Sequence, residues 1–349
     1  MSLLPFAAVF ATALGLSLLI TPLAARLGQR WGLVDVPDER RKHQGAVPRT
    51  GGMALFASFA AAALLSVFMA RLLPTPEGPD PKEMTRLAGI LLGSSFMFAV
   101  GLYDDRFELK AAPQYLAQLV AALIAIATLV FIERVMNPFT DRLFIFPWYI
   151  TAAITVFWIT GMINTVNFLD GLDGLAAGVA AIVAGVLFVH MLRVGQYSVS
   201  LLPLALLGST LGFLPYNYHP AKVFMGSTGA FFLGYAVATL SIVAGARMAT
   251  VLLVLAIPIL DVGWLILVRL RRSRGVGQAD RRHLHYRLLD LGFSQRQVVA
   301  AYCLLSAAFG VLALSISSRL FKLGALLVLG LVAVLVLAAV SWLGGNSRP

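Results

Sequence analysis

NTVNFLDGLDGLAAG, residues 164–178, places an amide or a carboxylate at every third position, and an apolar run long enough to cross a bilayer lies on each side of it. The polar residues are Asn164, Asn167, Asp170 and Asp173. A carboxylate is costly in hydrocarbon and is rarely retained there without a partner, a cavity or a cation. The stretch therefore predicts a membrane protein with a functional site at a membrane edge.

The whole chain has the composition of a polytopic membrane protein. Of its 349 residues, 59% are hydrophobic and 12% are charged, whereas soluble domains carry about a quarter charged residues. A helix needs about 20 apolar residues to cross the roughly 30 Å hydrocarbon core. We therefore expect one all-α transmembrane domain over residues 1–349. Its eleven helices are predicted near residues 3–22, 52–73, 86–103, 112–132, 144–160, 174–193, 198–214, 225–244, 248–270, 297–316 and 320–343.

The positions of the basic residues predict an orientation in the membrane. Most of the 27 Lys and Arg residues fall in one set of alternate loops and their flanks. By the positive-inside rule this set is cytoplasmic, so the N-terminus lies outside and the C-terminus inside. The net charge of +11 then reflects orientation and anionic membrane lipids rather than nucleic acid. The predicted cytoplasmic loops are residues 23–51, 104–111, 161–173, 215–224 and 271–296.

The acidic clusters all fall in these loops, which predicts an active site on the cytoplasmic face. Asp104 and Asp105 follow an apolar run directly, and adjacent carboxylates repel unless a divalent cation or a basic group compensates. A solvated helix end is the alternative for that pair. In the series 164–173, a spacing of three drifts by about 60° per step around a helix. The series therefore wraps around a ligand, or its backbone leaves the helix at Gly171 or Gly174.

The segment FMGSTG, residues 224–229, brings small residues and free backbone N–H groups just before another apolar run. This arrangement suits phosphate oxygens, although small residues also serve helix packing in membranes. Asp261, inside the ninth run, is interpreted as a structural residue that faces the bundle or pairs with a neighbouring helix.

Two basic segments contain histidine. His283 and His285 lie among arginines that include Arg282, and Lys42 and His43 lie in a similar segment. Such residues suit phosphate neutralisation and hydrogen bonding. A positive-inside loop that happens to contain His is the alternative for both. With the acidic clusters, these groups fit phosphoryl transfer onto a lipid-borne acceptor, in which a Mg²⁺ ion bridges phosphate oxygens.

Five segments together resemble a known family. They are DVPDERRKHQGAVPRTGG (35–52), GLYDDRFEL (101–109), NTVNFLDGLDGLAAG (164–178), GFLPYNYHPAKVFMGSTGAFFLGY (212–235) and DRRHLHYRLLDLGFSQRQ (280–297). In order and spacing, over about residues 20–300, they resemble the polyprenyl-phosphate N-acetylhexosamine-1-phosphate transferases of glycosyltransferase 4 type.

The resemblance implies an enzyme of the bacterial inner membrane. It would transfer N-acetylglucosamine 1-phosphate from its UDP sugar to undecaprenyl phosphate, releasing UMP, for cell-envelope glycan synthesis. The His-Leu-His form of the last motif and the eleven crossings resemble the N-acetylglucosamine branch. The alternative is the related phospho-N-acetylmuramoyl-pentapeptide translocase, which usually has three His there and ten crossings.

The resemblance also implies roles for residues. Asp104 and Asp105 would bind or deprotonate the lipid phosphate, and Asp170 would be a third catalytic residue. Mg²⁺, with Mn²⁺ as an alternative, would be held by Asp105, Asp170 and the residue at position 227, and a homodimer is expected. Direct attack by the lipid phosphate and a covalent Asp intermediate both stay open, and we favour direct attack. The implied substrate-binding residues are Lys42, His43, Asn164, Asn167, Asp173, Phe224, Gly226, Arg282, His283 and His285.

Position 227 departs from the family pattern FMGD, whose Asp is a principal Mg²⁺ ligand. A neutral hydroxyl such as that of Ser227 is a poor sole anchor for Mg²⁺. Ser227 either disables catalysis and leaves substrate binding intact, or leaves the metal to Asp105 or Asp170, or marks a non-catalytic lipid- or nucleotide-binding protein. We favour the first, because the other motifs are intact. Gln114 is a smaller departure, since a basic residue is expected there.

A transporter or channel is the rival class of function. It predicts polar residues at mid-membrane in several helices and an internal repeat. The acidic residues instead crowd the predicted cytoplasmic face, and the two halves of the sequence show no clear repeat.

Overall fold

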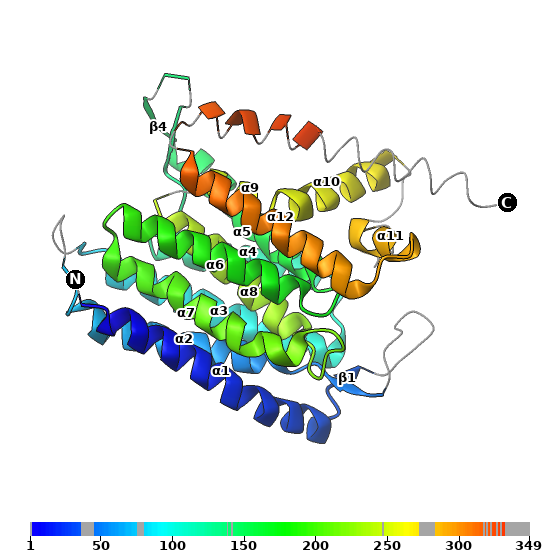
Figure 1. The fold of residues 1–349 in the computed structure, drawn as a ribbon. Coiled ribbons are helices and arrows are strands. Elements are labelled where there is room, and N and C mark those ends of the chain that lie inside the picture. The colour runs from blue at the N-terminus through cyan, green and yellow to red at the C-terminus, as the bar shows by residue number, and fades with distance from the viewer. Residues whose placement is uncertain are drawn as a thin grey trace.

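The computed structural model describes residues 2–35, 45–74, 80–137, 139–140, 142–245, 248–271 and 283–316, with isolated positions between 318 and 331. This part of the chain is a bundle of α-helices with two short antiparallel hairpins (Figure 1). The helices are α1 (Leu4–Trp31), α2 (Gly51–Ala70), α3 (Glu83–Phe107), α4 (Ala111–Ala127), α5 (Trp148–Leu169), α6 (Leu175–Arg193), α7 (Tyr197–Asn217), α8 (Gly226–Val243), α9 (Met248–Val254), α10 (Ala256–Arg271), α11 (Leu284–Asp290) and α12 (Gln295–Ser315). The strands are β1 (Val34–Asp35), β2 (Val47–Pro48), β3 (Arg134–Met136) and β4 (Leu143–Ile145).

Eight of the described helices are long and apolar enough to cross a membrane, namely α1, α2, α3, α5, α6, α7, α8 and α12. The all-α polytopic architecture is therefore confirmed. The fourth predicted crossing is α4, an apolar helix of 17 residues. The eleventh, 320–343, falls largely outside the described residues, so the count of eleven stays a prediction.

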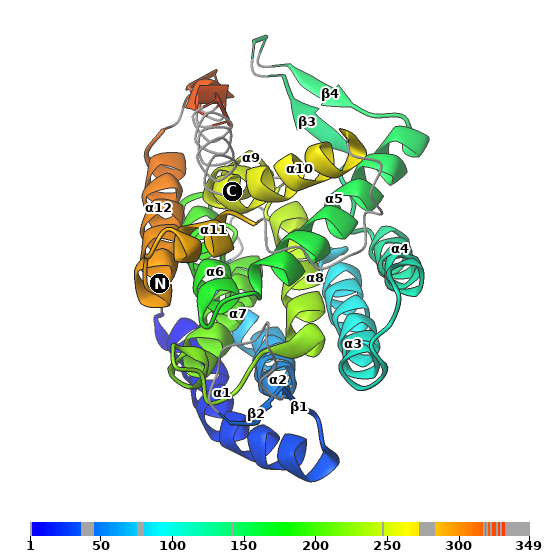
Figure 2. The ribbon, with the colours of Figure 1, turned by 90° about the vertical axis from the view of Figure 1, so that its right-hand side faces the viewer.

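The ninth apolar run is not a single helix. It is divided at Leu255 into α9 and α10. Proline has no N–H, and its ring clashes with the carbonyl four residues earlier, here that of Val254. Pro258 therefore explains the division, and Figure 2 shows α10 crossing the bundle at a different angle from its neighbours.

Several predicted loops are shorter than expected because helices continue past the apolar runs. Residues 23–31 belong to α1, 161–169 to α5 and 215–217 to α7. Hydropathy marks where hydrocarbon ends, whereas the helix continues until its hydrogen bonding is interrupted. For α1 this happens at Gly32, whose left-handed backbone (φ 68°) lets Leu33 N–H donate to the carbonyl of Gly28. Asn164 and Asn167 consequently lie on a regular helix.

Helix α8 lies at the centre of the bundle and packs mainly on α3, α5 and α2 (Figure 2). Most of its side chains are buried. Close packing on α3 depends on Gly101, because a Cβ there would lie 2.5 Å from the Cα of Thr228. This contact brings the C-terminal turn of α3 against the N-terminus of α8.

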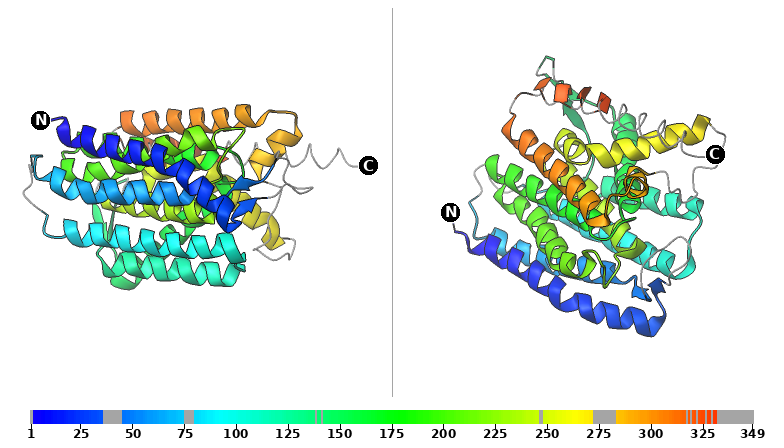
Figure 3. Two further views of the ribbon diagram at one scale, coloured as in Figure 1. Left: turned by 90° about the horizontal axis from the view of Figure 1, so that it is seen from below. Right: turned by 45° about the vertical axis from the view of Figure 1, so that its right-hand side comes forward.

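Most of the long helices lie roughly along one axis, so the bundle has two distinct ends (Figure 3). The N-terminus and the β3–β4 hairpin lie at one end, and the β1–β2 hairpin and α11 lie at the other (Figures 1 and 3). The second end receives the C-terminal ends of α3, α5 and α7 and the N-terminus of α8. All the described site residues named from the sequence therefore meet at that end, whereas Lys42, His43 and Arg282 lie outside the described residues.

Candidate active site

Asp105 joins the C-terminal turn of α3 to the N-terminus of α8. Its Oδ1 accepts from the backbone N–H of Ser227 at 2.8 Å, and its Oδ2 accepts from the N–H and the hydroxyl of Thr228 at 2.9 and 2.5 Å. The first N–H groups of a helix have no partner within the helix and carry its partial positive charge. Asp105 therefore acts as a capping carboxylate supplied from another helix.

The FMGSTG segment makes this geometry possible. Gly226 has φ 70°, and a Cβ there would lie 2.5 Å from the carbonyl oxygen of Arg49 and 2.6 Å from Asp105 Oδ2. On the other side of the segment, the carbonyl of Phe224 accepts from Gly51 N–H at 2.9 Å, at the start of α2. The segment thus holds the N-termini of two helices together, and its Ser227 is partly buried beside Asp105.

Asp104 faces a different neighbour from Asp105. It is buried, and its Oδ1 accepts from the backbone N–H of Leu109 and from Gln114 Nε2, both at 2.9 Å. These contacts fix the turn from α3 to α4. Gln114, noted as a departure from the family pattern, is therefore a partner of Asp104 in this structure.

The two asparagines of α5 have different surroundings. Asn164 pairs with the buried Gln118 of α4: its Nδ2 donates to Gln118 Oε1 at 2.6 Å and to the carbonyl of Thr160 at 2.8 Å. This amide pair joins two helices. Asn167 lies one turn further on, is partly buried and precedes Asp170 by three residues.

Asp170 stands at the C-terminal end of α5, where the chain leaves the helix in a turn that ends at Gly174 (φ 80°). Burial raises the pKa of Asp170 well above its ordinary value, the carboxylates of Asp105 and Asp173 raise it further, and Arg49 opposes them. Three carboxylates and one guanidinium thus interact at this point. Arg49 is itself held by an ion pair with Asp35 of β1.

Asp173 connects this turn to the loop after α7. Its Oδ2 lies 2.7 Å from His219 Nδ1 and accepts from Ala221 N–H at 3.1 Å. Beside it, Gly174 N–H donates to Asn217 Oδ1 at 3.0 Å, and Asn217 is almost fully buried. Asp173 therefore orders two loops at the site.

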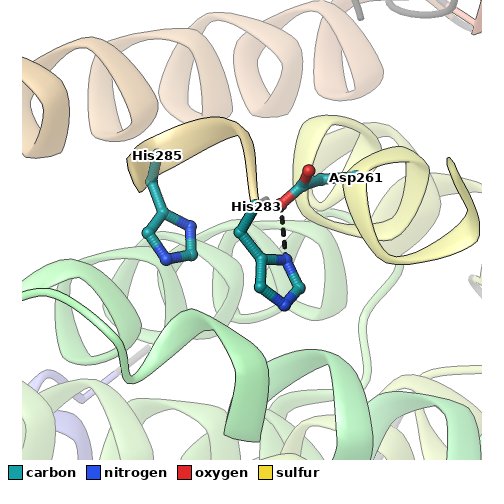
Figure 4. Close-up of side chains that lie close together, drawn as sticks. All are labelled: Asp261, His283 and His285. Carbon is teal, nitrogen blue, oxygen red and sulfur yellow. Dashed lines mark hydrogen bonds and ion pairs between the residues drawn. The ribbon is translucent and has the colours of Figure 1, made fainter. Parts of the chain in front are cut away.

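His283 and His285 lie at the start of α11, over the same turn. Their rings stack at 5.3 Å with 9° between the planes, and His283 also lies 5.3 Å from the Phe168 ring. A Cβ on Gly171 would lie 2.9 Å from His285 Nε2. Figure 4 shows His283 directed toward Asp261 of α10, whose Oδ2 lies 2.9 Å from His283 Nδ1.

Asp261, His283 and His285 are all buried and bring ligand atoms within 4.8 Å of one another. A hydrogen bond between His283 and Asp261 and a ring contact between the two histidines join the three residues. Their ligand atoms lie close enough together to hold a metal ion.

His285 is uncharged in this environment. Burial lowers its pKa to about 3, with a further lowering by His283 and a smaller opposing effect of Asp261. Its Nε2 is buried without a hydrogen-bond partner among the described atoms. A neutral imidazole at this place can offer a hydrogen bond to a ligand at the cost of little desolvation.

Sequence reasoning missed four residues that order the site, and the structure shows why. Gln118, Asn217 and His219 pair with residues 43 to 46 positions away, and no local pattern indicates such partners. Asp261 did carry a signal: a carboxylate inside an apolar run is a functional-site hypothesis by default. Its interpretation as a structural residue left out its contact with the His pair.

Comparisons with known proteins show which family the chain resembles. Residues 87–245 match the family model described as glycosyl transferase family 4. The chain is 34% identical over 307 residues to the probable undecaprenyl-phosphate N-acetylglucosaminyl 1-phosphate transferase of Bacillus subtilis, covering 86% of this chain and 82% of that protein. It is 31% identical to the decaprenyl-phosphate N-acetylglucosaminephosphotransferase of Mycobacterium leprae (93% and 89% covered). It is 28% identical to the undecaprenyl-phosphate alpha-N-acetylglucosaminyl 1-phosphate transferase of Yersinia pestis (84% and 78% covered).

Fold and site define a multi-pass membrane protein with an acidic and imidazole-bearing site at one end of its helical bundle. The chain belongs to the polyprenyl-phosphate N-acetylglucosamine-1-phosphate transferase family.

Proposed function

We propose that this protein transfers N-acetylglucosamine 1-phosphate from UDP-N-acetylglucosamine to undecaprenyl phosphate and releases UMP. The observation that carries the proposal is the environment of Asp170, where carboxylates from α3 and from the 170–174 turn meet Arg49 beside the His pair. Such a cluster of acidic and basic groups at a membrane edge suits two anionic substrates, one of them a lipid. The names of the relatives support N-acetylglucosamine and a polyprenyl acceptor.

A divalent cation fits part of this set. Burial, and secondly the charges of Asp105 and Asp173, raise the pKa of Asp170, and a cation would offset these effects. We propose that Asp170 and Asp105 would hold Mg²⁺ or Mn²⁺, beside Ser227. The ion would neutralise phosphate charge during transfer. Ser227 adds no charge, so the ion would be bound more weakly than with a carboxylate at this position.

The protein's own groups would divide the remaining work. Asn167 and the 170–174 turn would contact nucleotide and sugar, and Arg49 and the histidines would contact phosphates. The acceptor phosphate is already a nucleophile, so positioning and charge neutralisation are sufficient for direct attack. The distribution of Lys and Arg supports a cytoplasmic site, and the bacterial relatives support the inner membrane.

The test is transfer of radiolabelled N-acetylglucosamine 1-phosphate to undecaprenyl phosphate with added Mg²⁺, measured for the protein and for Ser227→Asp. We expect transfer by the Asp variant and a rate at least on the order of tenfold lower for the protein itself, because a ligand carboxylate contributes strongly to metal-site function. Equal rates would show that Asp105 and Asp170 suffice for the metal. No transfer by either form, with other UDP sugars also tried, would overturn the proposal.

A second candidate is a binding protein without turnover, and Ser227 is the observation that favours it. It predicts that the protein binds UDP-N-acetylglucosamine and undecaprenyl phosphate, whereas neither the protein nor Ser227→Asp releases UMP. Equilibrium binding measured beside the transfer assay separates the two candidates.

A further inference from the structure

Asp261 is a buried carboxylate with both oxygens occupied. Its Oδ2 meets His283 Nδ1 at 2.9 Å, and its Oδ1 accepts from the backbone N–H of Leu284 at 2.8 Å. Only 3% of the residue is exposed, and among the described residues His283 is its sole ion-pair partner. A buried carboxylate costs several kcal/mol unless its hydrogen bonds compensate, so the contacts of Asp261 with His283 and Leu284, at the start of α11, are strongly favoured.

The first consequence concerns which nitrogen of His283 carries a proton. A carboxylate only accepts hydrogen bonds, so the Nδ1 of His283 must carry a proton. The opposite nitrogen, Nε2, is then the atom that remains for a ligand, and Figure 4 shows it on the side of the ring away from α10. When Nε2 is also protonated, the imidazolium lies between Asp261 and any phosphate that it meets, and both anions stabilise it.

The second consequence concerns the position of α11. Leu284 is the first residue of α11, and His283 precedes it, so Asp261 fixes the start of this short helix from α10. From there the stacked rings of His283 and His285 reach Phe168 and Gly171, on either side of Asp170. Tyr286 adds a hydrogen bond from its hydroxyl to the carbonyl of Gly171 at 3.2 Å. The orientation of the His pair over the acidic turn thus depends on Asp261.

We propose that Asp261 is a positioning residue for phosphate recognition: it fixes the Nδ1-protonated form and the orientation of His283, and thereby places the Nε2 atom of His283 toward the pyrophosphate of the nucleotide donor. The proposal rests on the proposed function for the identity of that donor. The break at Leu255 separates α10 from α9, so that α10 lies at its own angle and brings Asp261 to His283.

The direct test is the protonation state of His283. The protein is labelled with ¹⁵N-histidine in nanodiscs, and His283→Gln assigns its signals among the five histidines. We expect the protein to show a protonated Nδ1, and Asp261→Asn to change that signal, because Asn has one acceptor oxygen for two donors. Asp290→Asn, an exposed residue at the far end of α11, is the matched control and should leave it unchanged. A proton on Nε2 alone, or an unchanged signal in Asp261→Asn, would overturn the proposal.

A double-mutant cycle tests the link to the donor in the Ser227→Asp background. Asp261→Asn and His283→Gln should each raise the KM for the UDP sugar by on the order of tenfold with a smaller change in kcat, and the double variant should be no worse than either single one. Independent, multiplying effects would overturn the positioning role while transfer itself stands. If no form transfers sugar, the same cycle is run on UDP binding by calorimetry, so that failure of the proposed function and failure of this inference remain distinct.

Discussion

Asp105 and Asp170 are both carboxylates of the site, and Asp105 has hydrogen-bond donors that offset part of the cost of its burial. Asp105 accepts three hydrogen bonds from the N-terminus of α8, which is a favourable position for negative charge. Asp170 lies among other carboxylates, and its raised pKa shows that its charge is unfavourable in the absence of a ligand. Substitution of Asp105 therefore removes hydrogen bonds, whereas substitution of Asp170 removes an unfavourable charge.

Substituting these two residues should therefore change stability in opposite directions. Asp105→Asn turns an NH₂ group toward donors of α8 and should lower stability by about 1–3 kcal/mol. Asp170→Asn should raise stability of the cation-free protein at neutral pH. The sign follows from linkage: with a raised pKa, stability is lost as pH rises through the folded-state pKa of Asp170, and Asn removes that loss. Both variants should lose transfer activity.

Thermal unfolding in detergent with a chelator present measures both effects. Asp80→Asn is the control, because it removes the charge of an exposed carboxylate that pairs with Arg86 and leaves an oxygen to accept from Lys82 N–H. Exposed ion pairs of this kind contribute about 1 kcal/mol or less. A lower melting temperature for Asp170→Asn would contradict the assignment of Asp170 as an unfavourable charge.

At the scale of elements, α11 is a short helix whose position depends on groups that titrate. The folded-state pKa of His285 is about 3, against an ordinary value of 6.5. A group whose pKa is lowered by folding contributes stability that is complete above its unfolded pKa and is lost as pH falls toward the folded value. We therefore expect α11 to loosen from the bundle as pH falls below about 6.5, by up to about 1.4 kcal/mol per pH unit.

Hydrogen exchange of residues 283–290 at pH 7 and pH 5, corrected for intrinsic rates, measures this effect. His285→Gln carries no titrating ring and should remove most of the difference between the two pH values. If the variant keeps the full pH dependence, another group controls the docking of α11.

The helices also show which features of the fold can be predicted from the sequence alone. Hydropathy predicted the long helices, and the acidic and glycine patterns drew attention to Asp105, Asp170 and Gly226, because these signals are local. The contacts that order this region are not local: Asp105 meets Thr228 across 123 positions, and Asp261 meets His283 across 22 positions. Loop boundaries failed for a simpler reason, since helices such as α5 continue beyond the apolar run that predicts them.

At the scale of the whole molecule, the candidate site occupies one end of the bundle. Its described carboxylates, amides and histidines lie where α3, α5 and α7 end, whereas the opposite end carries the β3–β4 hairpin (Figure 1). A transferase that uses a nucleotide sugar needs its site on the side of the membrane where that sugar is made. The proposed function therefore predicts the orientation in the membrane, which can be measured independently of activity.

Single cysteines at the two ends test this orientation. In a Cys303→Ser background, Glu108→Cys reports the end that holds the site and Thr140→Cys reports the β3–β4 hairpin, since both positions are exposed. With a membrane-impermeant thiol reagent on right-side-out vesicles, we expect labelling of Thr140→Cys only, and in inverted vesicles of Glu108→Cys only. Both should label after permeabilisation, which controls for reactivity. The reverse pattern would place the site outside, where a UDP sugar is not supplied, and would contradict both the positive-inside assignment and the proposed donor.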